Sequence, residues 1–488
     1  MKKACRFLLV ITLVMLSTSC KNKHVSSSPQ RTVNPLHYGL KEAKTGKDRY
    51  YVLQRTHKDA YRQGLGVSYA GIKEIVLDIP SDAKPLPLTY YTDFSGVTFI
   101  VTNTEKNIYL FSLSDKLIPV SVDGKEIDTR VFSRNQVLKS GKKLLVISDK
   151  TPWVENRIGH DYGATRKDIM LVENGVGSNT PIQSYSTSVS RPEGSYRDVG
   201  TNKIVVKGIV FNRTANSTKK TYLLKMENQS DVTLSNISIT TPEGSGLNGD
   251  RAMDLANCVN VKLEDISING TYSLPKQYGY GITLDNICAI QVNNMFGRGN
   301  WGIFGNNNVQ QAVLKNCDIN RFDIHCYGKD VSFENCNFVD LYNQFASVYG
   351  DVVFKDCTFS NFTPVLMGSS YNAYTAYDIR FENCTFNLDA KHASIVDFSG
   401  FCETENTRPE LKEKCLPNVA MRNCKVNVSG GLKKWFVINT KKTGEYDGVF
   451  SHLSSVTVEG LSYPEKQTNM ELFSKSVRTR NSVRMKKN

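Results

Sequence analysis

The chain lacks any run of 18 apolar residues, and it is poor in proline, with 15 prolines and 34 glycines in 488 residues. A transmembrane helix needs about 20 mostly apolar residues, so a spanning helix is excluded. The low proline content and the 10% aromatic residues exclude collagen-like and disordered chains. An acidic surplus is also lacking. Lys and Arg number 61 against 47 Asp and Glu, a net charge of +14, which favours acidic polysaccharide, nucleic acid or anionic lipid as partners.

The first 20 residues have the pattern of an export signal. Lys2, Lys3 and Arg6 precede a short apolar stretch at 7–15, and the sequence LSTSC ends at Cys20. This ending resembles a bacterial lipobox, which implies cleavage before Cys20 and lipidation of its thiol; an ordinary cleaved signal is the alternative. We therefore expect an exported monomer, anchored by lipid to a bacterial membrane, the outer one, on its surface or periplasmic side. Export argues against nucleic acid and favours an acidic polysaccharide.

One eight-residue pattern recurs along the chain: apolar, any, apolar, any, Asn/Asp/Gly, Cys or apolar, any, apolar. Alternation with period two is typical of strands, and its return every roughly 20–30 residues is typical of a stacked β-solenoid. The octets are Ile204 to Phe211, Val232 to Ile239, Val261 to Ile268, Ala312 to Ile319, Val331 to Phe338, Val352 to Phe359, Ile379 to Phe386 and Val419 to Val426, with Ile290 to Gly297 deviating only at its last position.

Two positions of the octet have a narrow residue choice. The sixth is cysteine in five octets, and because no His or acidic residue shares it, we expect a column of buried free thiols rather than a metal site or disulfides. The fifth is mostly Asn or Asp, which predicts a ladder of side-chain amides at a turn. Cys402 and Cys415, between octets, are either a disulfide or two free thiols. The five cysteines are Cys317, Cys336, Cys357, Cys384 and Cys424.

These repeats, from about 200 to 460, resemble the right-handed parallel β-helix of the pectate-lyase-like superfamily. The resemblance implies an all-β solenoid and covers a little over half of the chain. We divide the chain into a lipoprotein signal peptide (1–20), a tether (21–35), an N-terminal β-rich cap with the first coils (36–199), the parallel β-helix (200–463) and a basic, mobile tail (464–488). Within the cap, 120–147 is predicted as a small β-rich insertion and 153–175 as a loop against the helix wall.

A second strand precedes most octets and supplies the candidate site. Aligning Met253, Ile282, Ile303 and Ile324 as inward residues predicts two outward rows by alternation. The first row is Asp254, Thr283, Phe304 and His325, and the second is Asp285, Asn306, Tyr327 and Tyr349.

His325 is the leading catalytic candidate, because Asp323 and Arg321 precede it by two and four residues on the same expected face. Asp323 is expected either to orient the imidazole or only to pair with Arg321. β-Elimination of a uronate chain needs a base, a group that neutralises the carboxylate and an acid for the leaving oxygen. The candidate bases are His325, Tyr280 and Tyr327, the acids Tyr327 and Tyr280, and the neutralising groups Arg321, Arg298 and Asn300. Further substrate-binding candidates are Trp301, Asn306, Lys329, Tyr349 and Asp285.

The expected function is a polysaccharide lyase that acts on an acidic glycan, and the resemblance to β-helix lyases implies a glycosaminoglycan such as chondroitin sulfate. Many lyases of that superfamily use calcium, but Asp254, Asp285 and Asp323 lie on different rungs, so we expect no metal or other cofactor, with calcium as the alternative. The Asn-Thr-Asp, Asp-Asp and Gly-His-Gly signatures of polygalacturonase-like hydrolases are absent from the sequence. A hydrolase of the same fold and a non-catalytic carbohydrate-binding solenoid stay open as alternatives.

Overall fold

A computed structural model of the chain describes residues 31–154, 164–188, 190–213, 219–241, 251–270, 279–298, 301–345, 348–361, 363–367, 376–398, 418–440, 456–474 and 483–486. The predictions about the signal peptide, Cys20, Asn300, Cys402 and Cys415 fall outside these ranges. Within them, no helix combines the length and the apolar character needed to cross a bilayer.

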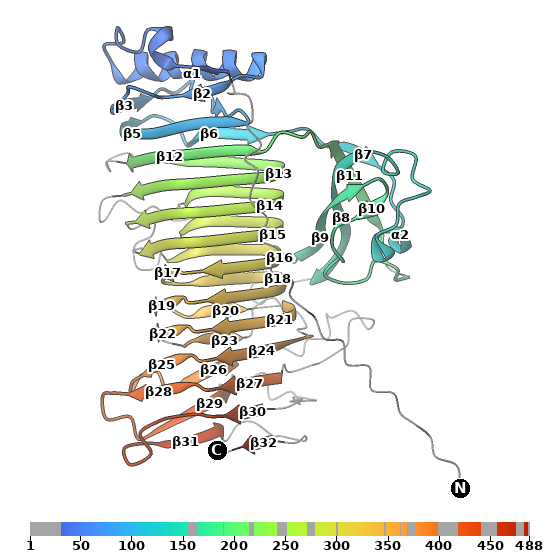
Figure 1. Cartoon of the computed structure of the whole chain (residues 1–488), viewed down its shortest axis with the longest axis vertical. Coiled ribbons are helices and arrows are strands. Elements are labelled where there is room, and N and C mark those ends of the chain that lie inside the picture. The colour runs from blue at the N-terminus through green and yellow to red at the C-terminus, as the bar shows by residue number, and fades with distance from the viewer. Residues whose placement is uncertain are drawn as a thin grey trace, which may run out of the picture.

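The chain folds as a right-handed parallel β-helix, as predicted (Figure 1). Its N-terminal strands are β1 (Thr32–Val33), β2 (Gly66–Ser68), β3 (Glu74–Ile79), β4 (Leu86–Pro87), β5 (Tyr91–Thr104) and β6 (Ile108–Ser114). The next are β12 (Ile204–Arg213), β13 (Thr221–Thr240), β14 (Arg251–Asn269), β15 (Tyr280–Arg298), β16 (Gly302–Lys315), β17 (Asp318–Ile319), β18 (Phe322–Glu334), β19 (Asn337–Asp340), β20 (Asn343–Phe345), β21 (Val348–Lys355) and β22 (Thr358–Asn361). The last are β23 (Val365–Met367), β24 (Ala376–Glu382), β25 (Thr385–Leu388), β26 (Ser394–Phe398), β27 (Asn418–Arg422), β28 (Lys425–Val428), β29 (Lys434–Thr440), β30 (Val456–Glu459), β31 (Asn469–Phe473) and β32 (Val483–Lys486).

Each complete coil contributes to three parallel sheets, which we number by their order along the chain. In β14, residues 251–256 belong to sheet I, 261–264 to sheet II and 266–269 to sheet III. The predicted octets form sheets II and III, and their first residues pair in register from Ile204 through Val232 to Val419. Val456 continues this register, so Val456 to Tyr463 is a tenth octet that the sequence analysis missed.

The turn between sheets II and III explains the fifth position of the octet. Every residue there has a left-handed backbone, with φ between 50° and 56° from Asn236 to Asn423. Asn, Asp and Gly adopt this conformation at the lowest cost. Several of the side chains also bond along the axis, for example Asn335 Nδ2 to Asn316 Oδ1 at 2.7 Å. The predicted ladder is confirmed, and its residue choice follows mainly from backbone conformation.

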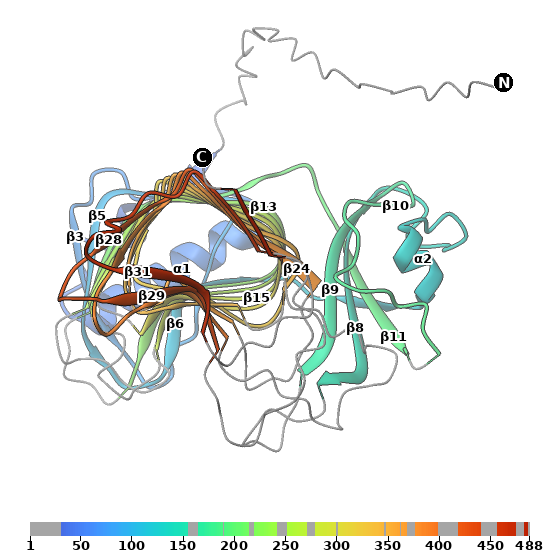
Figure 2. The ribbon, with the colours of Figure 1, turned by 90° about the horizontal axis from the view of Figure 1, so that it is seen from below.

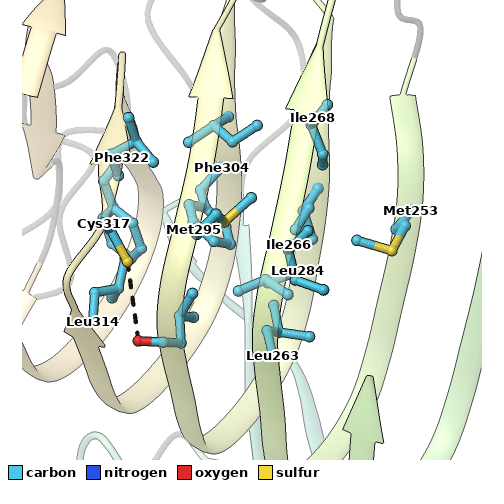
Figure 3. Close-up of a cluster of buried hydrophobic side chains, with 14 of the residues drawn as sticks. Met253, Leu263, Ile266, Ile268, Leu284, Met295, Phe304, Leu314, Cys317 and Phe322 are labelled. Carbon is cyan, nitrogen blue, oxygen red and sulfur yellow. Dashed lines mark hydrogen bonds between the residues drawn. The ribbon is translucent and has the colours of Figure 1, made fainter. Parts of the chain in front are cut away.

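The cysteine column is confirmed as well. The five octet cysteines are buried free thiols, and each Sγ lies against a backbone carbonyl, as Cys384 does at 3.4 Å from Phe354 O. Phenylalanines stack along the same axis, with Phe333 and Phe354 ring centroids 4.8 Å apart. Figure 3 shows Cys317 and Phe304 among the buried side chains. Phe304 is fully buried, so its predicted outward orientation is wrong.

Helix α1 (Gly46–Gln63), preceded by the short 3-10 helix η1 (Pro35–Tyr38), lies at the N-terminal end of the solenoid (Figure 1). The expected β-rich region therefore contains an α-helix. Its Thr45 capping box begins the helix and Gly64, with φ 64°, ends it. Tyr50, Leu53 and Ala60 are buried and pack with the hydrophobic core, which keeps the apolar end of the first coil from water.

A separate antiparallel sheet is inserted between β6 and β12. Its strands are β7 (Ile118–Val120), β8 (Lys142–Val154), β9 (Ala164–Glu173), β10 (Val176–Gly177) and β11 (Pro192–Asp198). The short helix α2 (Gly124–Thr129) lies between β7 and β8 in the chain. Figure 2 shows the inserted sheet beside the solenoid. The sheet packs on the outer wall of the β-helix, where Leu144, Ile169 and Leu171 contact Val259 and Cys288. The segment 153–175 thus reaches the wall, but its described part is mostly strand β9 and not a loop.

The C-terminal stretch predicted as a mobile basic tail contains two paired strands. β31 pairs in parallel with β29, and β32 pairs with β30. The β-helix therefore continues past residue 463.

Candidate active site

Four polar side chains meet on the outer face of sheet I. The Tyr280 hydroxyl donates to Asp323 Oδ2 at 2.7 Å and lies 2.9 Å from His325 Nε2. His325 Nε2 is 3.0 Å from the same Asp323 oxygen, and an Arg321 guanidinium N–H donates to it at 2.5 Å. Asp323 Oδ2 therefore lies within hydrogen-bond distance of a phenol, an imidazole and a guanidinium. We call Tyr280, Arg321, Asp323 and His325 the sheet I cluster.

A β-bulge places His325 in this cluster. Ile324 pairs with Asn306 and Cys326 pairs with Asn307, so His325 is an extra residue opposite the single position Asn307. Bulges redirect one side chain and are frequent beside active sites. The His325 side chain is 22% exposed, whereas Asp323 is fully buried beneath it. His325 is thus the member of the pair that a ligand on sheet I can reach.

Two glycines make room for Tyr280. A Cβ on Gly305 would lie 2.6 Å from the Tyr280 ring, and one on Gly302 would lie 3.0 Å from it. The ring therefore lies directly against the backbone of β16, and its hydroxyl reaches across that strand to Asp323 on β18. A residue with a side chain at position 305 would push the ring off the sheet.

Arg321 is held between two aromatic rings. Its guanidinium carbon is 4.7 Å from the Trp301 ring centroid and 4.4 Å from that of Tyr342, and one N–H lies 3.4 Å from Gln344 Oε1. The side chain is only 3% exposed. The prediction that Arg321 contacts a substrate carboxylate is therefore wrong for this structure, and Arg321 acts as the buried counter-ion of Asp323. Sequence reasoning missed Tyr342, Gln344 and the two glycines.

The electrostatics set the protonation of Asp323, Tyr280 and Arg321. The pKa of Asp323 is lowered to about 2, because the neighbouring Arg321 and His325 and the donated hydrogen bonds outweigh its burial. Burial and the Asp323 charge raise the pKa of Tyr280 well above its usual value. The Asp323 charge likewise raises the pKa of Arg321. At neutral pH the cluster therefore holds an ionised carboxylate and a protonated phenol, which makes Tyr280 a proton donor and not a base.

Several predicted site residues lie elsewhere. Met253 and Ile282 are aligned with Phe304 and Phe322, so the predicted alignment slips by one residue at Ile303 and by two at Ile324. Three further placements differ. Asn306 is fully buried on the row of Leu284 and Ile324 instead of facing outward, Tyr327 is buried with φ 55°, and Arg298 pairs with Asp318 beside sheet III. These three side chains do not join the cluster, and Tyr327 is not placed to act as an acid or base on the open face.

Other predicted binding residues contact the inserted sheet. Asp285 pairs with Lys167 at 3.1 Å, Lys329 donates to Thr180 Oγ1 at 2.7 Å, and Tyr349 accepts from Gln183. The insertion covers the C-terminal edge of sheet I, where this outward row ends. Because the docking of an inserted domain leaves no local pattern in the sequence, these residues resembled an open groove. Tyr280, Trp301 and His325 lie nearer to the N-terminal ends of the sheet I strands.

Asp168 lies buried at the contact between the insertion and the solenoid. It accepts hydrogen bonds from Ile182 N at 3.0 Å, Gln310 Nε2 at 2.5 Å and the Tyr185 hydroxyl at 2.9 Å. Burial raises its pKa to about 6 despite these bonds and the nearby Arg166. A folded pKa above the unfolded value means that stability from this group is full below about pH 4 and is lost as the pH rises through 6.

We therefore predict that the stability of the Asp168→Asn variant, which cannot ionise at this position, increases relative to that of the wild type as the pH rises. The difference in the free energy of unfolding between the two proteins should move by about 2 kcal/mol in favour of the variant between pH 4 and pH 7.5. Guanidinium denaturation at both pH values measures it. An unchanged difference would contradict the buried, proton-binding carboxyl.

Among the described residues, no group of three or more His, Cys, Asp or Glu side chains is placed to hold a metal ion. The three aspartates considered as calcium ligands have different partners. Asp254 pairs with Arg251, Asp285 with Lys167 and Asp323 with Arg321.

No protein-family model and no curated protein sequence matches the chain. Other solved structures share its fold, and three of them are bacteriophage tailspikes. The Gp54 tailspike of Acinetobacter baumannii bacteriophage AP22, in complex with A. baumannii capsular saccharide, is 13% identical with a TM-score of 0.54 and covers 93% of this chain and 79% of that one. The tailspike gp49 of Pseudomonas phage LKA1 is 12% identical (TM-score 0.53; 93% and 78% covered), and gp61 of Pseudomonas phage phi297 is 14% identical (TM-score 0.52; 91% and 76% covered). At sequence identities this low, the similarity establishes only a shared fold, the right-handed parallel β-helix.

Proposed function

We propose that the protein is a polysaccharide lyase that cleaves an acidic, uronate-containing glycan by β-elimination at the sheet I cluster. The observation that carries the proposal is the contact of one carboxylate oxygen with both Tyr280 and His325, with those two groups 2.9 Å apart. This arrangement connects a base and an acid through a single hydrogen bond. A tailspike of the same fold, solved with a capsular saccharide, and the net charge of +14 support an acidic glycan as the ligand.

His325 is the base in this proposal. Asp323 accepts its Nε2 proton and orients the imidazole, so the C5 proton of the uronate goes to Nδ1. The electrons of the C5–H bond form the C4–C5 double bond while the C4–O bond breaks. The Tyr280 hydroxyl donates its proton to the leaving oxygen, and His325 returns a proton to Tyr280 through their hydrogen bond. The elimination consumes no water. It leaves Tyr280 protonated and His325 neutral with its proton on Nδ1, and proton exchange with solvent restores the starting tautomer, with the proton on Nε2.

For neutralisation of the substrate carboxylate, Asn300 stays a prediction from the sequence, because this residue before Trp301 lies outside the described residues. Arg321 and Lys329 are occupied by Asp323 and by Thr180. Trp301 lies over Arg321 and bonds Tyr280, so it joins the edge of the cluster. We expect calcium to be dispensable in this scheme.

The pKa of Asp323 favours a lyase over a hydrolase. Hydrolysis of a glycosidic bond needs a carboxylic acid that is protonated at the working pH, beside a second carboxylate. Asp323, with a pKa of about 2, stays ionised, and its partners occupy the acceptor oxygen. Elimination needs no protonated carboxyl group.

A lipid on Cys20 would hold the solenoid at the outer membrane of a bacterium, where it meets extracellular glycan. Among acidic glycans, a sulfated glycosaminoglycan such as chondroitin sulfate suits the basic chain best.

The test is to incubate the full chain with chondroitin sulfate, polygalacturonate and alginate and to follow ultraviolet absorbance from the C4–C5 double bond. We expect absorbance to rise with at least one polymer and to persist in a chelator. New reducing ends without absorbance would indicate a hydrolase, and binding without either product would indicate a carbohydrate-binding solenoid. Either result would overturn the lyase proposal.

A further inference from the structure

A second group of one tyrosine, one aspartate and one arginine lies on sheet I, nearer to the N-terminus. The Tyr109 hydroxyl of β6 donates to Asp254 Oδ2 at 2.8 Å, and the Arg251 guanidinium lies 3.2 Å from the same oxygen. As in the sheet I cluster, a tyrosine reaches across one strand to an aspartate two strands further on, and an arginine pairs with that aspartate. Asp254 and Asp323 occupy the same outward row, three strand spacings apart, which is about 14 Å.

The intervening strand distinguishes the two groups. Below Tyr280 it carries glycines, whereas beside Tyr109 it carries Tyr222 and Lys225. The Tyr109 and Tyr222 rings have centroids 4.8 Å apart at 37°, and Lys225 Nζ lies 5.9 Å from the Tyr109 ring. Two rings and two cations therefore share one stretch of the face.

The second group is built for binding and not for proton transfer. The described contacts of Asp254 include Thr283, whose hydroxyl donates at 2.6 Å, and no histidine. Its cations are more accessible than Arg321. The Arg251 side chain is 36% exposed and that of Lys225, which pairs with Glu227 at 2.7 Å, is 34% exposed, against 3% for Arg321. A guanidinium that is anchored by an aspartate and still reaches solvent is suited to a carboxylate.

We propose that Tyr109, Tyr222, Lys225 and Arg251 form a distal subsite for another uronate ring of the same glycan chain. The ring face lies on the tyrosines, and its carboxylate is bound by Arg251 and Lys225. The chain then runs along the solenoid axis from this subsite to His325. The inference rests on the proposed acidic glycan, but not on the elimination chemistry.

Isothermal titration calorimetry of the full chain with chondroitin sulfate, polygalacturonate and alginate tests the subsite. The His325→Ala background prevents turnover. Tyr222→Ala and Arg251→Gln, each added to it, should raise Kd for the bound polymer about 5- to 10-fold. The matched control is Tyr61→Ala, a tyrosine that is 48% exposed and lies on helix α1 rather than on a strand of sheet I, and it should leave Kd unchanged. Thermal unfolding of each variant verifies that it folds.

Wild-type affinity in both subsite variants, or equal losses in the Tyr61→Ala control, would overturn the subsite, as would the absence of binding to all three polymers. Failure of the lyase proposal alone would give a different experimental result. In that case no double bond forms, while Tyr222→Ala and Arg251→Gln still weaken binding.

Discussion

His325→Ala is expected to lower kcat by roughly 10²–10⁴-fold, because it removes the group that accepts the C5 proton. The melting temperature should change little, since the side chain is on the outer face and 22% exposed. Turnover and thermal unfolding should be measured on the same preparation. Loss of both in parallel would instead indicate a histidine that only supports the fold.

His392→Ala is a matched control for this experiment. His392 also pairs with an aspartate, Asp389 at 2.8 Å, and its side chain is likewise 22% exposed, but it lies in the turn before β26. We expect its kcat to equal that of the wild type. Near-wild-type turnover of His325→Ala would show that His325 is not the base.

Asp323→Asn is expected to lower the free energy of unfolding by about 3–5 kcal/mol, because it leaves the Arg321 cation buried without its counter-ion. Activity should fall too, since His325 loses the group that orients it. Asp285→Asn is the comparison, because its pair with Lys167 is 39% exposed and should contribute at most about 1 kcal/mol. Equal costs for the two variants, measured by guanidinium denaturation, would contradict a buried pair at the base of the site.

The pH dependence of this effect has a defined direction. The folded pKa of Asp323, about 2, lies below the unfolded value of about 3.9. Its stabilisation is therefore full above about pH 4 and is lost as the pH falls toward 2. The stability difference between wild type and Asp323→Asn should shrink over that interval.

The coils could be predicted from the sequence because each octet carries its own constraints. Period-two alternation fixes which side chains face inward, and the left-handed turn restricts the fifth position to residues such as Asn236 and Gly208. Helix α1 and the docking of the insertion depend on contacts between distant segments. The octet pattern contains no signal for them.

The sequence predicted the residue types of the candidate site but not their geometry. Tyr280, Asp323 and His325 were named together as candidates, but the predicted alignment of the second strands slipped by one residue at Ile303 in β16, because Ile282 pairs with Phe304. A one-residue slip reverses every side chain of a strand, which is why Phe304 and Asn306 were assigned to the wrong face. The pair Gly302 and Gly305, three residues apart in a strand, was the one local signal that a ring lies against the sheet.

The most direct test of the central claim is a crystal structure of the His325→Ala protein with an oligosaccharide of the polymer that it binds. The account predicts a saccharide lying along sheet I, with a uronate ring over the Tyr280 hydroxyl and the vacated position 325. A saccharide bound on sheet II or III, or on the inserted sheet, with sheet I empty, would contradict it.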